Sequence, residues 1–215
     1  QMFLEDWHYS TGQVSGASLP PPELPAGGGG QVVQIIPAGP DELHAPILRA
    51  KITAMEHARE RIWLTTPYFV PDEPALFALT SAALRGVDVR ILVPRRSDNL
   101  LVTLAARSWF GELLRVGVRI WEYGPCMLHS KSLVVDDLYS FVGTDNFDNR
   151  SFRLNFEVAV LNYEPEAAAA LAAQFEADMA GAQELIVRQP RRTIAKRFPE
   201  ALARLASPCL LYTSP

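Results

Sequence analysis

Hydrophobic and polar positions follow two different periods along the chain. Short, mostly apolar runs have the two-residue period of β-strands, whereas longer segments repeat apolar positions every three or four residues, as amphipathic helices do. Strands are predicted at residues 32–36, 61–66, 87–93, 118–122, 133–135, 139–142 and 155–160, and helices at 44–59, 74–85, 99–116 and 165–179. This alternation predicts an α/β domain in which helices flank a mixed β-sheet.

A short polar string leads into the apolar run at 133–135. His129, Lys131 and Asp136 form the pattern H-x-K-x4-D, and the period of a strand would place His129 and Lys131 on one face. An imidazole beside an ammonium suits attack on phosphorus, because histidine can act as nucleophile or proton donor while lysine neutralises the phosphoryl oxygens. Asp136 is a third catalytic candidate, although a carboxylate at a strand end often orients backbone instead.

The sequence Gly-Thr-Asp-Asn at 143–146 offers neutral hydrogen-bond donors to the same site. A glycine turn would let Thr144 and Asn146 direct a hydroxyl and an amide at phosphate oxygens. The alternative for His129 and Lys131 is a purely structural role as a buried, hydrogen-bonded pair. Asn146 and Glu157, at fitting positions downstream, disfavour that alternative.

Strict alternation at 155–160 predicts which side chains of this strand face the core. Phe156, Val158 and Val160 should point inward, so Glu157 should point the other way. A carboxylate on a core strand is costly without a partner. We therefore expect Glu157 to hold the free ring nitrogen of His129 and to fix its tautomer.

These residues together resemble the second catalytic motif of the phospholipase D superfamily. The four residues at 143–146 stand in the place of the usual G-S-x-N, with Thr144 keeping the hydroxyl of serine, and Cys126 stands where a glycine is expected. Within the superfamily the chain is most similar to bacterial cardiolipin synthases, over roughly residues 1–208. The segments that carry this likeness are 66–72, 85–94 and 154–158, whereas Asn149-Arg150-Ser151 belongs to the superfamily motif.

The resemblance implies a phospholipase D-like layered domain and a two-step exchange at a phosphodiester. One motif's histidine attacks phosphorus and forms a phosphohistidine, while the other motif's histidine protonates the departing alcohol and later deprotonates the incoming hydroxyl. In a cardiolipin synthase that hydroxyl belongs to a second phospholipid, usually phosphatidylglycerol. The chain carries one motif, so a missing N-terminal catalytic half or a second copy would complete the site. The family pattern favours His129 as the acid/base, but the sequence leaves the nucleophile role open.

Composition fits a domain that can bury a core, with 215 residues, 48% hydrophobic content and a net charge of −4. This charge argues against a nucleic-acid partner, and basic clusters at 95–96 and 188–197 are more often solvated faces. Cys126 and Cys209 match no disulfide or metal spacing, and metal-binding motifs such as H-E-x-x-H are absent from the sequence. We therefore expect no metal and no other cofactor.

Three parts are expected along the chain. Residues 1–30 are interpreted as the remnant of a preceding domain with a Pro/Gly-rich linker, 31–187 as the catalytic domain and 188–215 as a basic tail. Within the tail, 198–205 suits a packing helix or an amphipathic helix on a membrane surface, and 209–215 receive no role. Membrane-spanning segments are expected upstream, which would place the complete protein at the bacterial cell membrane with anionic phospholipid as substrate.

Two other classes of function compete with a phosphatidyltransferase half-domain. One is a one-motif phospholipase D-like nuclease or phosphodiesterase acting as a homodimer, and the other is a non-catalytic module that retains the fold. The Phe-Leu-Glu-Asp-Trp segment at 3–7 resembles the region after the first motif of two-motif enzymes, which favours a part of such an enzyme. The intact H-x-K-x4-D string disfavours a non-catalytic module.

Overall fold

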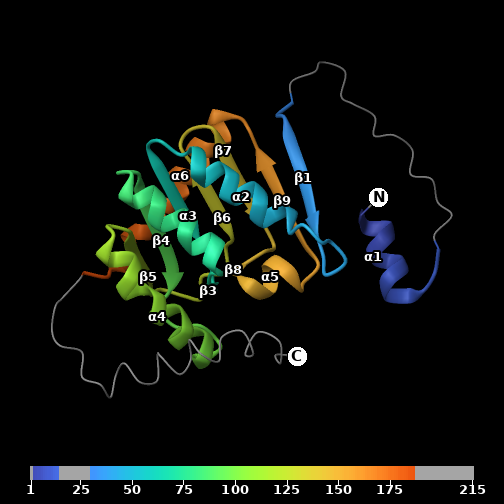
Figure 1. The fold of residues 1–215 in the computed structure, drawn as a ribbon, viewed down its shortest axis with the longest axis horizontal. Coiled ribbons are helices and arrows are strands. Elements are labelled where there is room, and N and C mark those ends of the chain that lie inside the picture. Colours follow the sequence, from blue (N-terminus) through green and yellow to red (C-terminus); the bar gives the residue numbers. More distant parts are fainter. Residues whose placement is uncertain (1, 15–29, 187–215) are drawn as a thin grey trace. The chain divides into compact units, whose positions relative to one another are not determined.

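A mixed sheet of eight strands organises this computed structural model, which describes residues 2–14 and 30–186 (Figure 1). β2, β4 and β5 run parallel, and every other pair of neighbours in this sheet is antiparallel. From one edge to the other the strands are β1 (Val33–Ala38), β9 (Glu157–Asn162), β7 (Tyr139–Gly143), β6 (Ser132–Val135), β2 (Arg61–Thr65), β4 (Asp88–Pro94), β5 (Arg119–Tyr123) and β10 (Ala182–Glu184).

Helices cover both faces of this sheet (Figure 1). Helices α2 (Pro46–His57), α3 (Glu73–Leu84) and α4 (Leu100–Arg115) contribute to one buried cluster, and α6 (Pro165–Ala180) contributes to the other. Because successive side chains of a strand point to opposite faces, Ile62 and Leu64 of β2 join the first cluster while Trp63 stacks on Phe175 of α6. The molecule is therefore a helix–sheet–helix sandwich.

Local sequence signals set the helix ends. The Asp72 carboxylate accepts a hydrogen bond from the backbone N–H of Ala75 and caps the start of α3. Asn99 caps α4 in the same way. Gly86 and Gly117 follow these two helices with φ of 91° and 96°, a left-handed conformation that glycine adopts without strain. Both glycines therefore end their helices.

A small second sheet holds the loop that follows β7. Strand β3 (Phe69–Val70) pairs in parallel with β8 (Phe147–Asp148), and the short helix α5 (Asn149–Arg153) follows directly. The rings of Phe69 and Phe147 stack with centroids 5.8 Å apart, and the N–H of Phe147 donates to the Thr66 hydroxyl at 3.0 Å. These contacts fix residues 144–148 against the segment that follows β2.

The sequence-based assignment of elements is confirmed for the fold class and for the main helices and strands, but the orientation of β9 was predicted wrongly. Ala159 and Leu161 are the buried residues of this strand, and Phe156 is 44% exposed. Apolar residues occupy both sides of β9, so the alternation alone does not indicate which side meets the helices. Glu157 consequently shares its strand face with the buried Ala159.

The structure divides the chain into two compact units, Gln1–Gln31 and Val32–Pro215, and α1 (Met2–Thr11) belongs to the first. All the other elements described above belong to the second. The predicted Pro/Gly-rich linker, apart from its last residue, and the basic tail with its 198–205 and 209–215 segments lie outside the described residues. Within 2–14 and 30–186, no helix combines the length and hydropathy of a bilayer-crossing segment.

Candidate active site

A cavity of about 490 Å³ lies at the ends of three central strands, where β6 begins and where β2 and β7 end. The C-terminal half of α6 forms the facing wall. Three of the residues that the sequence singles out, His129, Lys131 and Thr144, line it together. The complete lining consists of Thr65, His129, Ser130, Lys131, Ser132, Val142, Gly143, Thr144, Leu171, Gln174, Phe175 and Asp178.

His129 and Lys131 are adjacent in space, but the arrangement differs from the predicted strand face. Strand β6 starts at Ser132, so both residues lie in the irregular segment before it. The Lys131 ammonium donates a hydrogen bond to the carbonyl oxygen of His129 at 2.8 Å. It also lies 2.9 Å from Nδ1 and 3.2 Å from Nε2 of the His129 ring. The fold therefore presents an imidazole and an ammonium side by side at the cavity wall.

Burial and the charges of carboxylates act on the pKa of the Lys131 ammonium in opposite directions. Partial burial lowers the pKa of Lys131, while the charges of Glu157, Asp145 and Asp148 act in the opposite direction. A half-buried cation is less hydrated than one in bulk water. Such a cation interacts more strongly with the oxygens of a phosphate group that enters the cavity.

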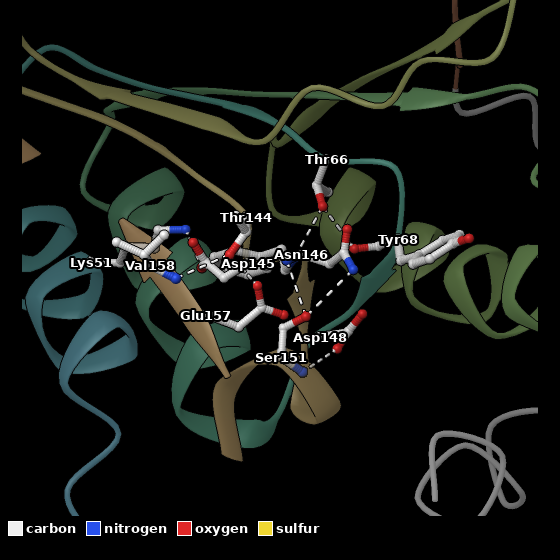
Figure 2. Close-up of polar contacts among 11 residues, drawn as sticks. Lys51, Thr66, Tyr68, Thr144, Asp145, Asn146, Asp148, Ser151, Glu157 and Val158 are labelled. Carbon is white, nitrogen blue, oxygen red and sulfur yellow. Dashed lines mark hydrogen bonds and ion pairs between the residues drawn. The ribbon is translucent and has the colours of Figure 1, made fainter. Parts of the chain in front are cut away.

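The Glu157 carboxylate supports Thr144 (Figure 2). The Thr144 hydroxyl donates to one oxygen of the Glu157 carboxylate, and the Asn155 amide donates to the other at 3.0 Å. The same hydroxyl accepts the N–H of Val158 at 3.0 Å. The expectation that Glu157 binds the free ring nitrogen of His129 is thus wrong for this structure, because Lys131 occupies the place beside the ring. The Thr144 hydroxyl has one hydrogen, which it donates to Glu157, so in this structure it links Glu157 to the backbone of β9.

Gly143 is required by a close approach of two strands. A Cβ at this position would lie 2.6 Å from the carbonyl oxygen of Val158 and 3.0 Å from Cα of Ala159. Both distances are shorter than ordinary contacts, so any side chain would push β7 away from β9. The glycine that the sequence suggests as a turn therefore allows the close contact that seats Thr144 on β9.

Asn146 lies in a second polar cluster with Ser151, Asp148 and Thr66 (Figure 2). Its N–H donates to the Ser151 hydroxyl at 3.1 Å, and its side-chain oxygen is buried with no protein partner among the described residues. Asp148 caps α5 through the N–H of Ser151, and burial raises the pKa of Asp148 to about 6. Asn146 is not among the residues that line the cavity.

A buried ion pair that the sequence analysis did not identify anchors this loop. The Lys51 ammonium of α2 lies 2.5 Å from the Asp145 carboxylate, and the two side chains are only 4% and 1% exposed (Figure 2). Burial raises the pKa of Asp145, and the Lys51 charge works against that rise. A signal was present, since Lys51 shares the apolar stripe of its helix with Ile47 and Met55.

Asp136, the third catalytic candidate from the sequence, orients backbone in this structure and is not among the residues that line the cavity. Its carboxylate accepts the backbone N–H groups of Arg59, Glu60 and Arg61 at 2.9–3.0 Å. It lies beyond the end of the four-residue strand β6 that starts beside Lys131. The backbone of Asp136 is left-handed, with φ 52°, a conformation that aspartate tolerates better than most residues. Asp136 therefore holds the turn into β2.

Replacement of Asp136 by alanine should lower stability without lowering intrinsic activity. The change would leave three backbone N–H groups without their acceptor, a loss of about 1–3 kcal/mol. Thermal unfolding of the complete protein should show a lower Tm, while activity per folded molecule stays unchanged. Asp137→Ala is the matched control, because the Asp137 side chain is 66% exposed and its ion pair contributes about 0–1 kcal/mol. A loss of activity beyond the loss of folded protein would return Asp136 to the catalytic set.

The described residues contain no cluster of three or more His, Cys, Asp or Glu side chains arranged to hold a metal ion. Cys126 is exposed with a free thiol. Of the other histidines, His44 precedes α2 and His57 ends it, and neither lines the cavity. Within the described part of the chain, His129 and Lys131 supply the imidazole and the ammonium of the cavity lining.

A mixed sheet between helices, with a histidine–lysine pair from H-x-K-x4-D at its edge, defines a phospholipase D-like domain. Residues 52–179 match the family model "Cardiolipin synthase, PLD-like domain", and the chain belongs to this family. The predicted family and fold are thereby confirmed. The cardiolipin synthase of Geobacillus sp. (strain WCH70) is 42% identical over 214 residues, which cover 97% of this chain and 42% of that relative. The chain thus spans less than half the length of the curated relatives it matches.

Solved structures share the fold at low sequence identity. Nuc from Salmonella typhimurium, a phospholipase D family member, has a TM-score of 0.62 at 20% identity and covers 73% of this chain and 99% of its own. The phosphatidylserine synthase of Haemophilus influenzae Rd KW20 has a TM-score of 0.61 at 18% identity, covering 85% of this chain and 48% of that one. The shared architecture therefore accounts for nearly the whole of the Nuc chain and for about half of the phosphatidylserine synthase chain.

Proposed function

We propose that this chain is one catalytic half of a phosphatidyltransferase that converts two phosphatidylglycerol molecules into cardiolipin and glycerol. The observation that carries the proposal is the His129–Lys131 pair at the wall of a cavity, within a domain of the cardiolipin synthase family. The pair supplies a group that can form or break a bond to phosphorus, or move a proton, beside a cation for the phosphoryl oxygens.

The proposed reaction is an exchange of alcohols on one phosphorus. In the first step one histidine nitrogen forms a bond to phosphorus, the bond from phosphorus to the glycerol oxygen breaks, and the other histidine protonates that oxygen. In the second step glycerol has left, and the histidine that gave up its proton is neutral and takes the proton of the incoming hydroxyl. That oxygen then bonds to phosphorus while the phosphohistidine bond breaks. His129 fits either role, and Lys131 stabilises the charge in both steps.

The proposed reaction needs a second histidine, which another polypeptide segment has to supply. In the described part of the chain His129 is the one histidine that lines the cavity, and the relatives are more than twice as long as the matched region. We therefore propose that the N-terminal half of the complete protein supplies the second histidine and lysine, in preference to a second copy of this chain. The substrate would be anionic phospholipid at the bacterial membrane surface, where the complete protein would be anchored.

A homodimeric one-motif phosphodiesterase is the less favoured alternative, because 97% of the chain matches cardiolipin synthase relatives. The complete protein should convert phosphatidylglycerol in vesicles to cardiolipin and free glycerol in equal amounts, measured by mass spectrometry of the lipid and enzymatic assay of the glycerol. A hydrolase would release phosphatidic acid and glycerol instead. Phosphatidic acid as the sole lipid product, or no turnover under conditions where the protein is folded, would overturn the proposed function.

A further inference from the structure

The wall of the cavity that faces the catalytic pair carries two polar side chains that the proposed chemistry does not use. Gln174 and Asp178 of α6 both line the cavity, and the Gln174 amide donates a hydrogen bond to the Asp178 carboxylate at 2.9 Å. They lie one helical turn apart, at positions i and i+4, so both point toward the same side of α6. Their apolar neighbours in the lining are Leu171 and Phe175.

Packing of α6 holds this pair in place. Ala168, Ala172 and Phe175 are buried against the sheet, and the Phe175 ring stacks on Trp63 of β2 with centroids 5.3 Å apart. A polar pair on a helix that is anchored in this way keeps a fixed orientation toward the cavity. The position is therefore suited to recognition of a ligand that enters from the catalytic edge.

Two opposite charges line the cavity, from different elements of the fold. Lys131, before β6, favours the negative phosphate group, whereas the Asp178 carboxylate of α6 repels it. A carboxylate accepts hydrogen bonds from neutral hydroxyls, and the amide of Gln174 offers both a donor and an acceptor. Neighbouring hydroxyls on a short carbon chain satisfy such a pair better than water or a simple alcohol does. A volume of about 490 Å³ is ample for a group of that size.

We propose that Gln174 and Asp178 bind the free hydroxyls of a glycerol headgroup and thereby select a polyol as the alcohol that enters or leaves the phosphorus. This inference rests on the proposed phosphatidyl transfer, because it assigns the alcohol site of that reaction. It makes the two side chains specificity-determining residues, whereas His129 and Lys131 act on the phosphorus. An acceptor hydroxyl on a bound polyol is held near the phosphate, which favours transfer over attack by water.

A competition between two alcohols tests the assignment in the complete protein. Phosphatidylglycerol vesicles are incubated with deuterated glycerol and 1-propanol together, and mass spectrometry measures deuterated phosphatidylglycerol against phosphatidylpropanol. In each product the incoming oxygen replaces the glycerol oxygen on phosphorus, and the departing glycerol receives the proton of the incoming hydroxyl. Because both products come from one enzyme sample, their ratio does not depend on the fraction of folded protein.

Asp178→Asn should lower the ratio of glycerol product to propanol product by about tenfold or more, because a site built to bind hydroxyls loses its charged acceptor. Gln174→Leu should shift the ratio in the same direction. Glu176→Gln is the matched control, since Glu176 is an exposed residue of the same helix, and it should leave the ratio unchanged. An unchanged ratio in Asp178→Asn, with wild-type transfer intact, would overturn the subsite alone. Absence of both products with the wild-type protein would overturn the phosphatidyl transfer and the subsite with it.

Discussion

Replacing His129 with alanine in the complete protein is expected to reduce cardiolipin formation by about 10²–10⁴-fold, the contribution of a positioned acid/base or nucleophile. His129 lines the cavity beside the Lys131 ammonium, and no other histidine of the described residues does. The side chain is exposed, so its removal should leave the fold intact. Initial rates from phosphatidylglycerol vesicles, with circular dichroism of the same preparations, measure both effects.

His57→Ala is the matched control for this substitution. His57 is also an exposed histidine, at the end of α2, where its ring contacts the carbonyl oxygen of Thr53 at 2.8 Å. Its loss should change the rate little. If the His129 variant kept a rate within a few-fold of wild type while remaining folded, the catalytic assignment of the H-x-K-x4-D string would have to be abandoned.

The long elements of the fold were predictable because each is long enough for its hydrophobic positions to repeat several times with the period of a helix or of a strand. Helix α4 and strand β4, for example, lie within about one residue of their predicted limits. Strands β3 and β8 have two residues each, too few for any period to be visible. They exist because tertiary contacts, such as the stacked rings of Phe69 and Phe147, bring two loops together. Local sequence carries no record of that pairing.

Three of the six predicted site residues line the cavity, but the contacts of the candidate site were not predictable. The motif places His129, Lys131 and Thr144 at one cavity, yet the partner of Glu157 is Thr144 and not His129. The error follows from β9, where apolar residues on both sides hide which face is buried. Once the true face is known, the Glu157 side chain points toward the loop after β7, where the Thr144 hydroxyl lies.

The least predictable feature was the buried ion pair between Lys51 and Asp145, because Lys51 lies far from the motif in the sequence. Lys51 lies 94 positions before Asp145, and a pair at that separation is visible only in the folded chain. Breaking a buried ion pair by removing one partner typically costs about 3–5 kcal/mol, because the other charge is left uncompensated. The pair therefore ties the loop that carries Thr144 and Asn146 to the core under α2, and the sequence signal for it was a lysine within an apolar stripe.

The 215-residue chain by itself is expected to show no cardiolipin formation as a monomer. Exchange at phosphorus needs a nucleophile and a proton donor on opposite sides, and one His129 cannot occupy both places. Exposed apolar residues, such as Val142 of the cavity lining at 48% exposure and Ile35 of the edge strand β1 at 53%, should also favour nonspecific association of the isolated chain. Light scattering and an assay with phosphatidylglycerol vesicles measure the two properties on one preparation.

Addition of the separately produced N-terminal half should restore activity if the two halves share one site. The restored rate should disappear when this chain carries His129→Ala, because the mixed site then lacks one of its two histidines. It should survive when the chain carries His57→Ala, since that histidine lies at the end of α2 away from the cavity lining. A stable monomer of the 215 residues that forms cardiolipin unaided would show that a single H-x-K-x4-D motif suffices. That result would remove the need for a second half, since one histidine would have to serve both sides of the phosphorus in turn.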